Sequence, residues 1–208
     1  MLEAWRCGVT KKIRSSVVSR KTKETSVKVA LVLDGATRRA VEVSTPLPFL
    51  NHMLTLLGSH AGFGLSISAS GDVEVDDHHL VEDIGICLGQ ALSKAMAGKE
   101  GIRRYGEAVV PMDEALVQAV VDISGRSHLV YGVKPGAKKI KNFEVGLVEE
   151  FLLGLARNVP CTIHLRQIAG GSAHHVIEAA FKALGRALSA AVEKDSRFRG
   201  VPSTKGRL

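Results

Sequence analysis

Aromatic residues are scarce in this chain: Phe, Trp and Tyr make up 4% of its 208 residues. A surface on which successive nucleic-acid bases stack needs more aromatic side chains than this, so we expect no such platform. The three cysteines, Cys7, Cys87 and Cys161, are far apart and form no CxxC motif. No apolar run reaches the roughly 18–20 residues of a membrane-spanning helix. These absences predict a protein of a reducing compartment that does not enter a membrane.

Net positive charge is also scarce outside one segment, although the formal net charge of the whole chain is +7. Residues 1–23 hold seven Lys and Arg and one Glu, whereas the remaining chain holds 21 basic and 20 acidic residues. The body is therefore almost neutral, and the basicity belongs to an N-terminal arm that we expect to be solvated. We predict no nucleic-acid partner for the body of the chain.

The chain contains an internal duplication. The element HHxxE occurs at 78–82 and again at 174–178, an offset of 96 residues, and Gly89/Gly185 and Ser93/Ser189 are identical pairs at the same offset. Glu24 to Val27 resembles Glu114 to Val117, and 49–57 resembles 148–155. A repeat of 90–100 residues predicts that both halves share one architecture.

Each half has the same order of expected elements. Alternating or β-branched apolar residues predict strands over 13–20, 27–33, 41–43, 65–70, 108–112, 117–123, 129–133 and 161–166. Apolar residues at helical spacing predict helices over 49–57, 78–96, 145–157 and 173–194. We expect 108–112 to pair with 117–123, and 13–20 to play the same part in the first half.

This order favours an α+β fold over a doubly wound sheet, because strands cluster before helices. The simplest architecture is two mixed β-sheets that sandwich a layer of four helices. We predict a basic arm over 1–13, half-repeats over 14–103 and 104–196 that form one compact domain, and a C-terminal tail over 197–208 that contributes to substrate binding.

The two HHxxE elements have the spacing of metal ligands on a helix. Residues three or four apart share a helix face, so each Glu can lie beside its histidines. Adjacent histidines point about 100° apart and cannot easily hold one ion together. We therefore predict two related metal sites, each with ligands from both halves. Six of the eight histidines fit this scheme: His52, His78, His79, His164, His174 and His175.

Imidazole and carboxylate together suit a transition ion such as Zn, Fe, Ni or Mn. A single HHxxE is a weak motif and is often structural, but two copies at equivalent places of a repeat favour metal binding. The phosphate-binding candidates are Arg104, Arg126, Lys182 and Lys205. Lys182 lies at i+4 from Glu178, which is equally the spacing of an ordinary helix ion pair.

Several longer motifs resemble the imidazoleglycerol-phosphate dehydratase family of histidine biosynthesis. They stand in order along 14–208: RKTKET (20–25), FLNHML (49–54), DDHHLVED (76–83), PMDEA (111–115), DISGR (122–126), HHVIEAAFK (174–182) and PSTKG (202–206). The resemblance implies a duplicated fold with four helices between two sheets. It also implies two Mn²⁺ ions per active site and a homo-oligomer of 24 subunits with sites between subunits. Bacterial cytoplasm is the expected location, or the plastid if the source is a plant or alga.

By the same resemblance, one metal ion is held by His52, His79, Glu82 and His174, and the other by His78, His164, His175 and Glu178. The implied substrate contacts are Glu24, His60, Arg104, Arg126, Lys182, Ser203, Thr204 and Lys205. The implied catalytic residues are Glu24, His52, His79, Glu82, His175 and Glu178, with Glu24 as the candidate general acid/base.

The implied reaction is a hydro-lyase step that removes water from imidazoleglycerol phosphate and gives imidazoleacetol phosphate. Two alternatives stay open on the residues alone. A di-metal hydrolase of phosphate esters or amides would use the same ligands to activate water. A metal-storing or nucleic-acid-binding protein would rely on the basic arm, and its binding would weaken with salt.

Overall fold

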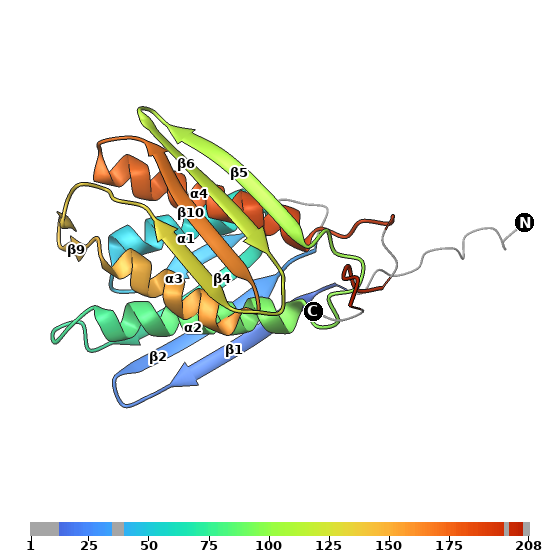
Figure 1. The fold of residues 1–208 in the computed structure, drawn as a ribbon. Coiled ribbons are helices and arrows are strands. Elements are labelled where there is room, and N and C mark those ends of the chain that lie inside the picture. The colour runs from blue at the N-terminus through green and yellow to red at the C-terminus, as the bar shows by residue number, and fades with distance from the viewer. Residues whose placement is uncertain (1–12, 35–39, 198–199, 206–208) are drawn as a thin grey trace, which may run out of the picture.

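The computed structural model describes residues 13–34, 40–197 and 200–205, so the predicted basic arm lies almost wholly outside the described residues. Two four-stranded sheets enclose four helices, with one sheet above and the other below them in Figure 1. This confirms the α+β class and the sandwich of two mixed sheets around a helical layer. No helix among the described residues has the length and apolar character needed to cross a bilayer.

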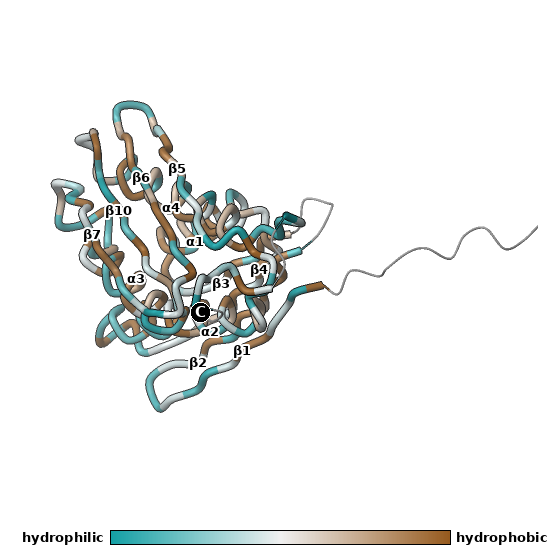
Figure 2. The backbone as a smooth tube through the Cα atoms, turned by 45° about the vertical axis from the view of Figure 1, so that its right-hand side comes forward, coloured by the Kyte–Doolittle hydropathy of each residue, from teal (hydrophilic) through white to brown (hydrophobic). Residues whose placement is uncertain are grey.

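The strands form because apolar side chains alternate with polar ones. Buried and accessible residues alternate along β2 and β6, and hydrophobic and hydrophilic segments alternate along the strands in Figure 2. The first sheet contains β1 (Ser15–Lys21), β2 (Thr25–Val32), β3 (Val41–Ser44) and β4 (Gly64–Gly71). The second contains β5 (Tyr105–Met112), β6 (Ala115–Asp122), β7 (His128–Gly132) and β10 (Thr162–Ala169).

Both sheets have the same topology. Their orders are β1-β2-β4-β3 and β5-β6-β10-β7, and the last two strands of each order are parallel while the other pairs are antiparallel. The expected pairing of 108–112 with 117–123 is confirmed, as is the equivalent pairing of β1 with β2. A two-stranded ribbon of β8 (Lys139–Ile140) and β9 (Phe143–Glu144) was not expected from the sequence.

The four helices lie close to their predicted positions: α1 (Pro48–Ala61), α2 (His78–Ala95), α3 (Leu147–Asn158) and α4 (Ala173–Val192). Pro48 stands in the first turn of α1, where its missing N–H costs nothing, and Gly62 ends that helix with a φ of 67°. α2 packs on β1 and β2, while α4 packs on β5 and β6.

Helix pairing joins the two halves of the repeat. α1 lies against α4, and α2 lies against α3. An added Cβ at Gly185 would be 2.6 Å from the Leu57 carbonyl oxygen, and one at Gly89 would be 2.5 Å from that of Leu155. The glycine pair found at an offset of 96 therefore makes the same helix contact in both halves. Because each half covers its helices with those of the other, the core is continuous across the repeat.

Two of the three cysteines are buried thiols. Cys87 and Cys161 are buried and free of disulfides. Burial raises the pKa of the Cys87 thiol to about 11 and that of Cys161 to about 12. Both therefore serve as small core side chains rather than as nucleophiles or metal ligands.

Candidate metal centre

The HHxxE elements open α2 and α4, and local hydrogen bonds fix where these helices begin. The Asp76 carboxylate accepts from the His78 N–H at 3.0 Å, and the Ser172 hydroxyl caps α4 by accepting from the His175 N–H at 3.5 Å. Neighbouring imidazoles diverge in both elements. The rings of His78 and His79 stand at 90°, and those of His174 and His175 at 83°. Each helix start therefore offers its two histidines in two different directions.

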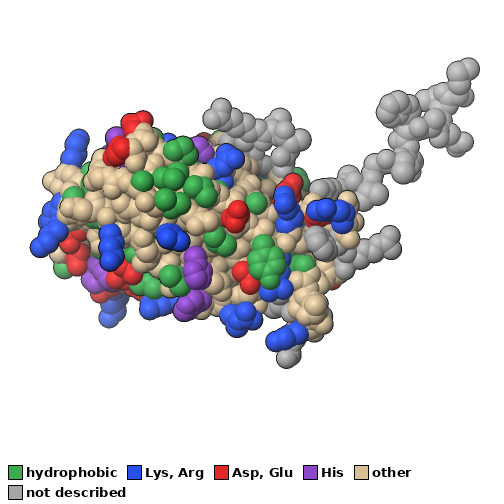
Figure 3. Space-filling model, turned by 45° about the horizontal axis from the view of Figure 1, so that its top comes forward, with side chains coloured by type: hydrophobic (Ala, Val, Ile, Leu, Met, Phe, Trp, Pro, Cys, Tyr) green, Lys and Arg blue, Asp and Glu red, His purple; other side chains and the backbone are tan. Residues whose placement is uncertain are grey.

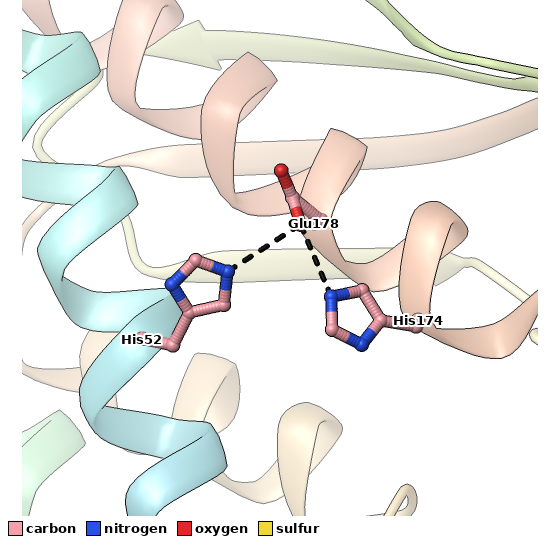
Figure 4. A group of neighbouring side chains, drawn as sticks. All are labelled: His52, His174 and Glu178. Carbon is pink, nitrogen blue, oxygen red and sulfur yellow. Dashed lines mark hydrogen bonds and ion pairs between the residues drawn. The ribbon is translucent and has the colours of Figure 1, made fainter.

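His52, His174 and Glu178 form a group whose ligand atoms all lie within 4.8 Å of one another (Figure 4). The Glu178 Oε2 atom is 3.2 Å from His174 Nε2 and 3.5 Å from His52 Nε2. His52 comes from α1 and the other two from α4, so the group joins the two halves. Phe49, one turn before His52, packs edge-on against the His174 ring at 5.5 Å and limits its rotation.

Glu178 is held as an anion within this group. Its side chain is 9% exposed, and its Oε1 atom pairs with Lys182 Nζ at 2.6 Å. Burial acts to raise the Glu178 pKa, but hydrogen bonds and charge from Lys182 and His52 outweigh it, and the pKa lies below its usual range. Lys182 therefore forms the ordinary i, i+4 helix ion pair with Glu178. This pair uses Glu178 Oε1, so Glu178 Oε2 remains turned toward the two imidazoles.

His79 faces carboxylates from two other elements. Its Nδ1 atom is 3.4 Å from Asp72 Oδ2 and 3.8 Å from Glu24 Oε2. Asp72 Oδ1 and His79 Nδ1 are the two buried side-chain polar atoms, among the described residues, that have no hydrogen-bond partner. Buried polar atoms rarely stay unpaired, so this place fits a group that binds there.

His175 occupies the equivalent place in the second half and is firmly held. Its Nδ1 atom is 2.8 Å from Glu114 Oε2, while Glu114 Oε1 accepts from the Ser172 N–H at 2.9 Å. The hydrogen bond to Glu114 raises the His175 pKa and is the main reason that the Glu114 pKa falls to about 2. A carboxylate that binds one imidazole nitrogen orients the other toward a metal ion, as in many metal sites.

The remaining predicted ligands lie apart within a single chain. His164 is exposed on β10 and alternates with the buried Ile163 and Leu165, so it lies on the outer face of the second sheet. There it lines a cavity of about 350 Å³ with Gln118, Val120 and Arg166. His78 and Glu82 join no group of three metal-binding side chains among the described residues. Histidines likewise occupy several separate places on the face drawn in Figure 3.

The predicted substrate contacts fall into two groups. His60, in the last turn of α1, faces α4, where Lys182 lies one turn after Glu178; the pKa of His60 is lowered by burial and by the charges of Lys182 and Arg186. Arg104 lies at the far end of α4, where its N–H donates to the Ala191 carbonyl. Its guanidinium binds the carboxylate of Asp122, with Nε 2.8 Å from Oδ1.

The C-terminal segment passes the Arg104 side chain. Arg104 Nη1 donates to the Pro202 carbonyl at 3.0 Å, which places Ser203 next to this cation. Thr204 and Lys205 follow, and the Lys205 N–H donates to the Ser203 hydroxyl at 3.2 Å. Arg126 is exposed in the turn after β6. These residues share cationic or hydroxyl chemistry, but within one chain they do not converge on His52 and Glu178.

Two carboxylates of this centre were missed by the sequence reasoning. Asp72 follows a strand as an ordinary turn residue would, so no local pattern marked it. Glu114 carried a usable signal, because it stands opposite Glu24 in the repeat, and His175 stands opposite His79. Because Glu24 and His79 were both candidate site residues, the repeat could therefore have marked Glu114 as a candidate beside His175.

Comparisons with known proteins agree on one family. The family model for imidazoleglycerol-phosphate dehydratase matches residues 45–188. The imidazoleglycerol-phosphate dehydratase of Geobacillus sp. (strain WCH70) is 50% identical over 94% of this chain and all of that protein. That of Bacillus subtilis (strain 168) is 51% identical over 91% of this chain and 96% of that protein.

Solved structures give the same result. A crystal structure of IGPD from Pyrococcus furiosus, in complex with (S)-C348, aligns with a TM-score of 0.79 and 41% identity, and it covers 92% of this chain and 100% of that one. The imidazoleglycerol-phosphate dehydratase of Staphylococcus aureus aligns with a TM-score of 0.76 and 38% identity, over 86% of this chain and 99% of that one.

Proposed function

This chain belongs to the imidazoleglycerol-phosphate dehydratase family and is an enzyme, and on that premise we propose that it dehydrates imidazoleglycerol phosphate to imidazoleacetol phosphate in histidine biosynthesis. The observation that carries the proposal is the group formed by His52, His174 and Glu178, which offers two imidazoles and one ionised carboxylate at metal-binding distance. We place the enzyme in the cytoplasm, or in the plastid of a plant or alga.

The donor set fits a divalent transition ion, and we propose two Mn²⁺ ions per site. Imidazole and carboxylate suit such ions, and the buried Asp72 Oδ1 and His79 Nδ1 atoms, which make no hydrogen bond, favour a second place of binding. The proposed ligands are His52, His78, His79, Glu82, His164, His174, His175 and Glu178. Within one chain, His52, His174 and Glu178 group together, which takes two ligands from the first expected set and one from the second. The assignment of each ligand to one of two ions remains a prediction.

When bound, the metals supply Lewis acidity and a template for the substrate's imidazole ring. The chain's own residues then have separate tasks. Glu24 is the proposed acid/base: its exposed carboxylate moves a proton to the departing hydroxyl or from the neighbouring carbon, so that water leaves and an enol becomes the ketone. The cations Arg104, Arg126, Lys182 and Lys205 hold the phosphate and fix the orientation of the reacting carbons.

We further propose that more than one copy builds each site. Arg104 bonds to Ala191, which lies 13 residues after Glu178 on α4. At about 1.5 Å per residue these groups are separated by about 20 Å along the helix, too far for one small substrate. His164 faces away from the helices on the other side of the second sheet. A homo-oligomer, such as the 24-subunit assembly that the resemblance implies, brings these separated groups together.

The test is an assay of the purified protein with imidazoleglycerol phosphate, together with elemental analysis. We expect a new ketone, no inorganic phosphate, loss of turnover after chelation and recovery with Mn²⁺. Release of phosphate without a ketone would instead support the di-metal hydrolase. Full turnover by protein freed of all transition metal would overturn the proposed role of the metals.

A further inference from the structure

A polar cluster built around a buried carboxylate lies beneath the turn that carries Glu24. The turn between β1 and β2 lies at the end of the molecule where α2 begins (Figure 1). Asp83, on α2, is 6% exposed and is one of four buried polar or charged residues among those described. Its Oδ1 atom accepts from Arg20 Nε at 2.7 Å, and its Oδ2 atom accepts from the Thr25 hydroxyl at 2.5 Å. Asp83 therefore ties α2 to both strands of this hairpin.

The cluster continues to the backbone of Glu24. Because the Thr25 hydroxyl donates to Asp83, its oxygen can accept from the Thr22 hydroxyl, which is 3.1 Å away. The Thr22 oxygen in turn accepts from the N–H groups of Glu24 and Thr25 at 3.1 and 2.9 Å. On the other side, the Glu24 carbonyl accepts from the Asp72 N–H at 3.2 Å. The backbone of Glu24 is therefore held on both sides by hydrogen bonds, while its carboxylate points toward His79.

The second half of the repeat contains no polar cluster at this place. By the ladder register, Arg20 faces Val27 as Val110 faces Val117. Thr25 and Asp83 likewise correspond to Ala115 and Ala179. These three equivalents are Val110, Ala115 and Ala179, and all of them are buried. The fold therefore closes this position with apolar side chains, and a charged cluster is not needed to form the hairpin or to seat it on the helix.

We propose that Asp83 is a positioning residue, which acts through Thr25 and Thr22 to hold Glu24 at a fixed place relative to the metal-binding start of α2. The inference rests on the proposed function, in which Glu24 moves the proton. The polar cluster of Arg20, Thr25 and Asp83 is then needed for turnover rather than for folding. Burying a carboxylate carries a desolvation penalty. The apolar equivalent in the second half shows that the same fold forms at this position without that penalty.

The chain itself supplies the test variant. The triple variant Arg20→Val, Thr25→Ala, Asp83→Ala installs the apolar cluster of the second half in the first. Asp83→Ala alone leaves Arg20 and Thr25 without their acceptor, so it is expected to lower both the unfolding midpoint and kcat. The triple variant is expected to recover the midpoint but not kcat, which stays lower by about tenfold or more while KM changes by less than about threefold. A triple variant with wild-type kcat overturns the proposal.

A matched control comes from the same two elements. The Ser16 hydroxyl donates to the Ala91 carbonyl at 2.7 Å, two turns further along α2. Ser16→Ala removes one bond between β1 and α2, so the midpoint should fall while kcat stays unchanged. A second pair guards against a triple variant that fails to fold. Thr25→Val keeps the shape of the side chain but loses the hydroxyl, so its turnover should fall. Thr25→Ser keeps the hydroxyl and should recover most of the turnover that Thr25→Val loses. Unchanged turnover in Thr25→Val overturns the proposal.

Amide hydrogen exchange separates this inference from the proposed function. If the wild-type protein makes no ketone, the dehydratase proposal fails, and the role of Asp83 is then judged on the amides of Glu24 and Thr25. Faster exchange at these two amides in Thr25→Val supports positioning through the hydroxyl relay. Unchanged exchange at both amides overturns it.

Discussion

The spacing between α1 and α4 sets the geometry of the His52–His174–Glu178 group, and Gly185→Ala tests this dependence. An added Cβ at Gly185 would lie 2.6 Å from the Leu57 carbonyl oxygen and 3.2 Å from the Ala61 nitrogen. Both contacts are backbone atoms, so no side chain can rotate away. Carbon and carbonyl oxygen approach to about 3.3 Å at closest, and the two helices must therefore move apart by about 0.7 Å.

This separation has two separate consequences. Overpacking of this kind costs about 1–3 kcal/mol, and the higher helix propensity of Ala offsets roughly 1 kcal/mol of it, so we expect a destabilisation of at most about 2 kcal/mol. His52 moves with α1 while His174 and Glu178 stay on α4. Metal–ligand distances tolerate only about 0.2 Å, so Mn²⁺ affinity at this group should fall by about tenfold or more, or ~1.4 kcal/mol.

The repeat provides the matched control. Gly89→Ala, whose Cβ would lie 2.5 Å from the Leu155 carbonyl oxygen, strains α2 and α3 equally but does not move His52. Denaturant unfolding of the apoprotein at one fixed concentration should give similar losses for both variants. Titration with Mn²⁺ should give a weaker site in Gly185→Ala than in Gly89→Ala. Mn²⁺ affinity in Gly185→Ala that equals that of the wild-type protein would refute the argument that helix spacing positions these ligands.

The other predictions concern individual residues. Glu24→Gln should leave metal content and KM nearly unchanged and lower kcat by about a hundredfold or more, and near-normal turnover would remove Glu24 from the mechanism. Glu178→Gln should lower bound metal per chain in elemental analysis, because the anionic ligand of the group is lost; undiminished metal would contradict its role. The folded pKa of His175 is raised above 6.5, so its contribution to apoprotein stability is present below that pH and is lost as the pH rises through the folded pKa. The Glu114 pKa is lowered from 4.5 to about 2, so its contribution is present above 4.5 and is lost as the pH falls. Glu114→Gln should therefore lower the apoprotein Tm most between about pH 4.5 and 6.5, and a difference from wild type that does not depend on pH would refute this pairing.

The fold could be predicted from the sequence because its signals are local and occur twice. Alternation along 27–33 and 117–123, and helical spacing after the histidine pairs, each identified an element, and the repeat supplied an independent second reading. The α1 helix extends four residues beyond the predicted 49–57 because Gly62, rather than the last large apolar residue, ends it. The ribbon of β8 and β9 was missed because strands of two residues contain no alternation to detect.

The site could be predicted only in part, because its contacts are not local. The histidine pairs and their divergence follow from helix geometry and were visible in the sequence. The position of Glu178 between His52 and His174 depends on the pairing of α1 with α4, which no local pattern encodes. The ion pair between Asp83 and Arg20 joins residues 63 apart, and only the crossing of a hairpin over a helix brings them together.

The duplicated fold gives the two equivalent glutamates different environments, and this difference supports the role proposed for Glu24. Glu114 is bonded to His175 and to the Ser172 N–H, and these hydrogen bonds lower its pKa to about 2, so both of its carboxylate oxygens are already engaged. Glu24 lies 3.8 Å from His79, which Asp72 approaches more closely at 3.4 Å. Because Asp72 takes the place beside this imidazole that Glu114 holds in the other half, the carboxylate of Glu24 remains available. We therefore propose Glu24, rather than Glu114, as the residue that gains and loses a proton during each turnover.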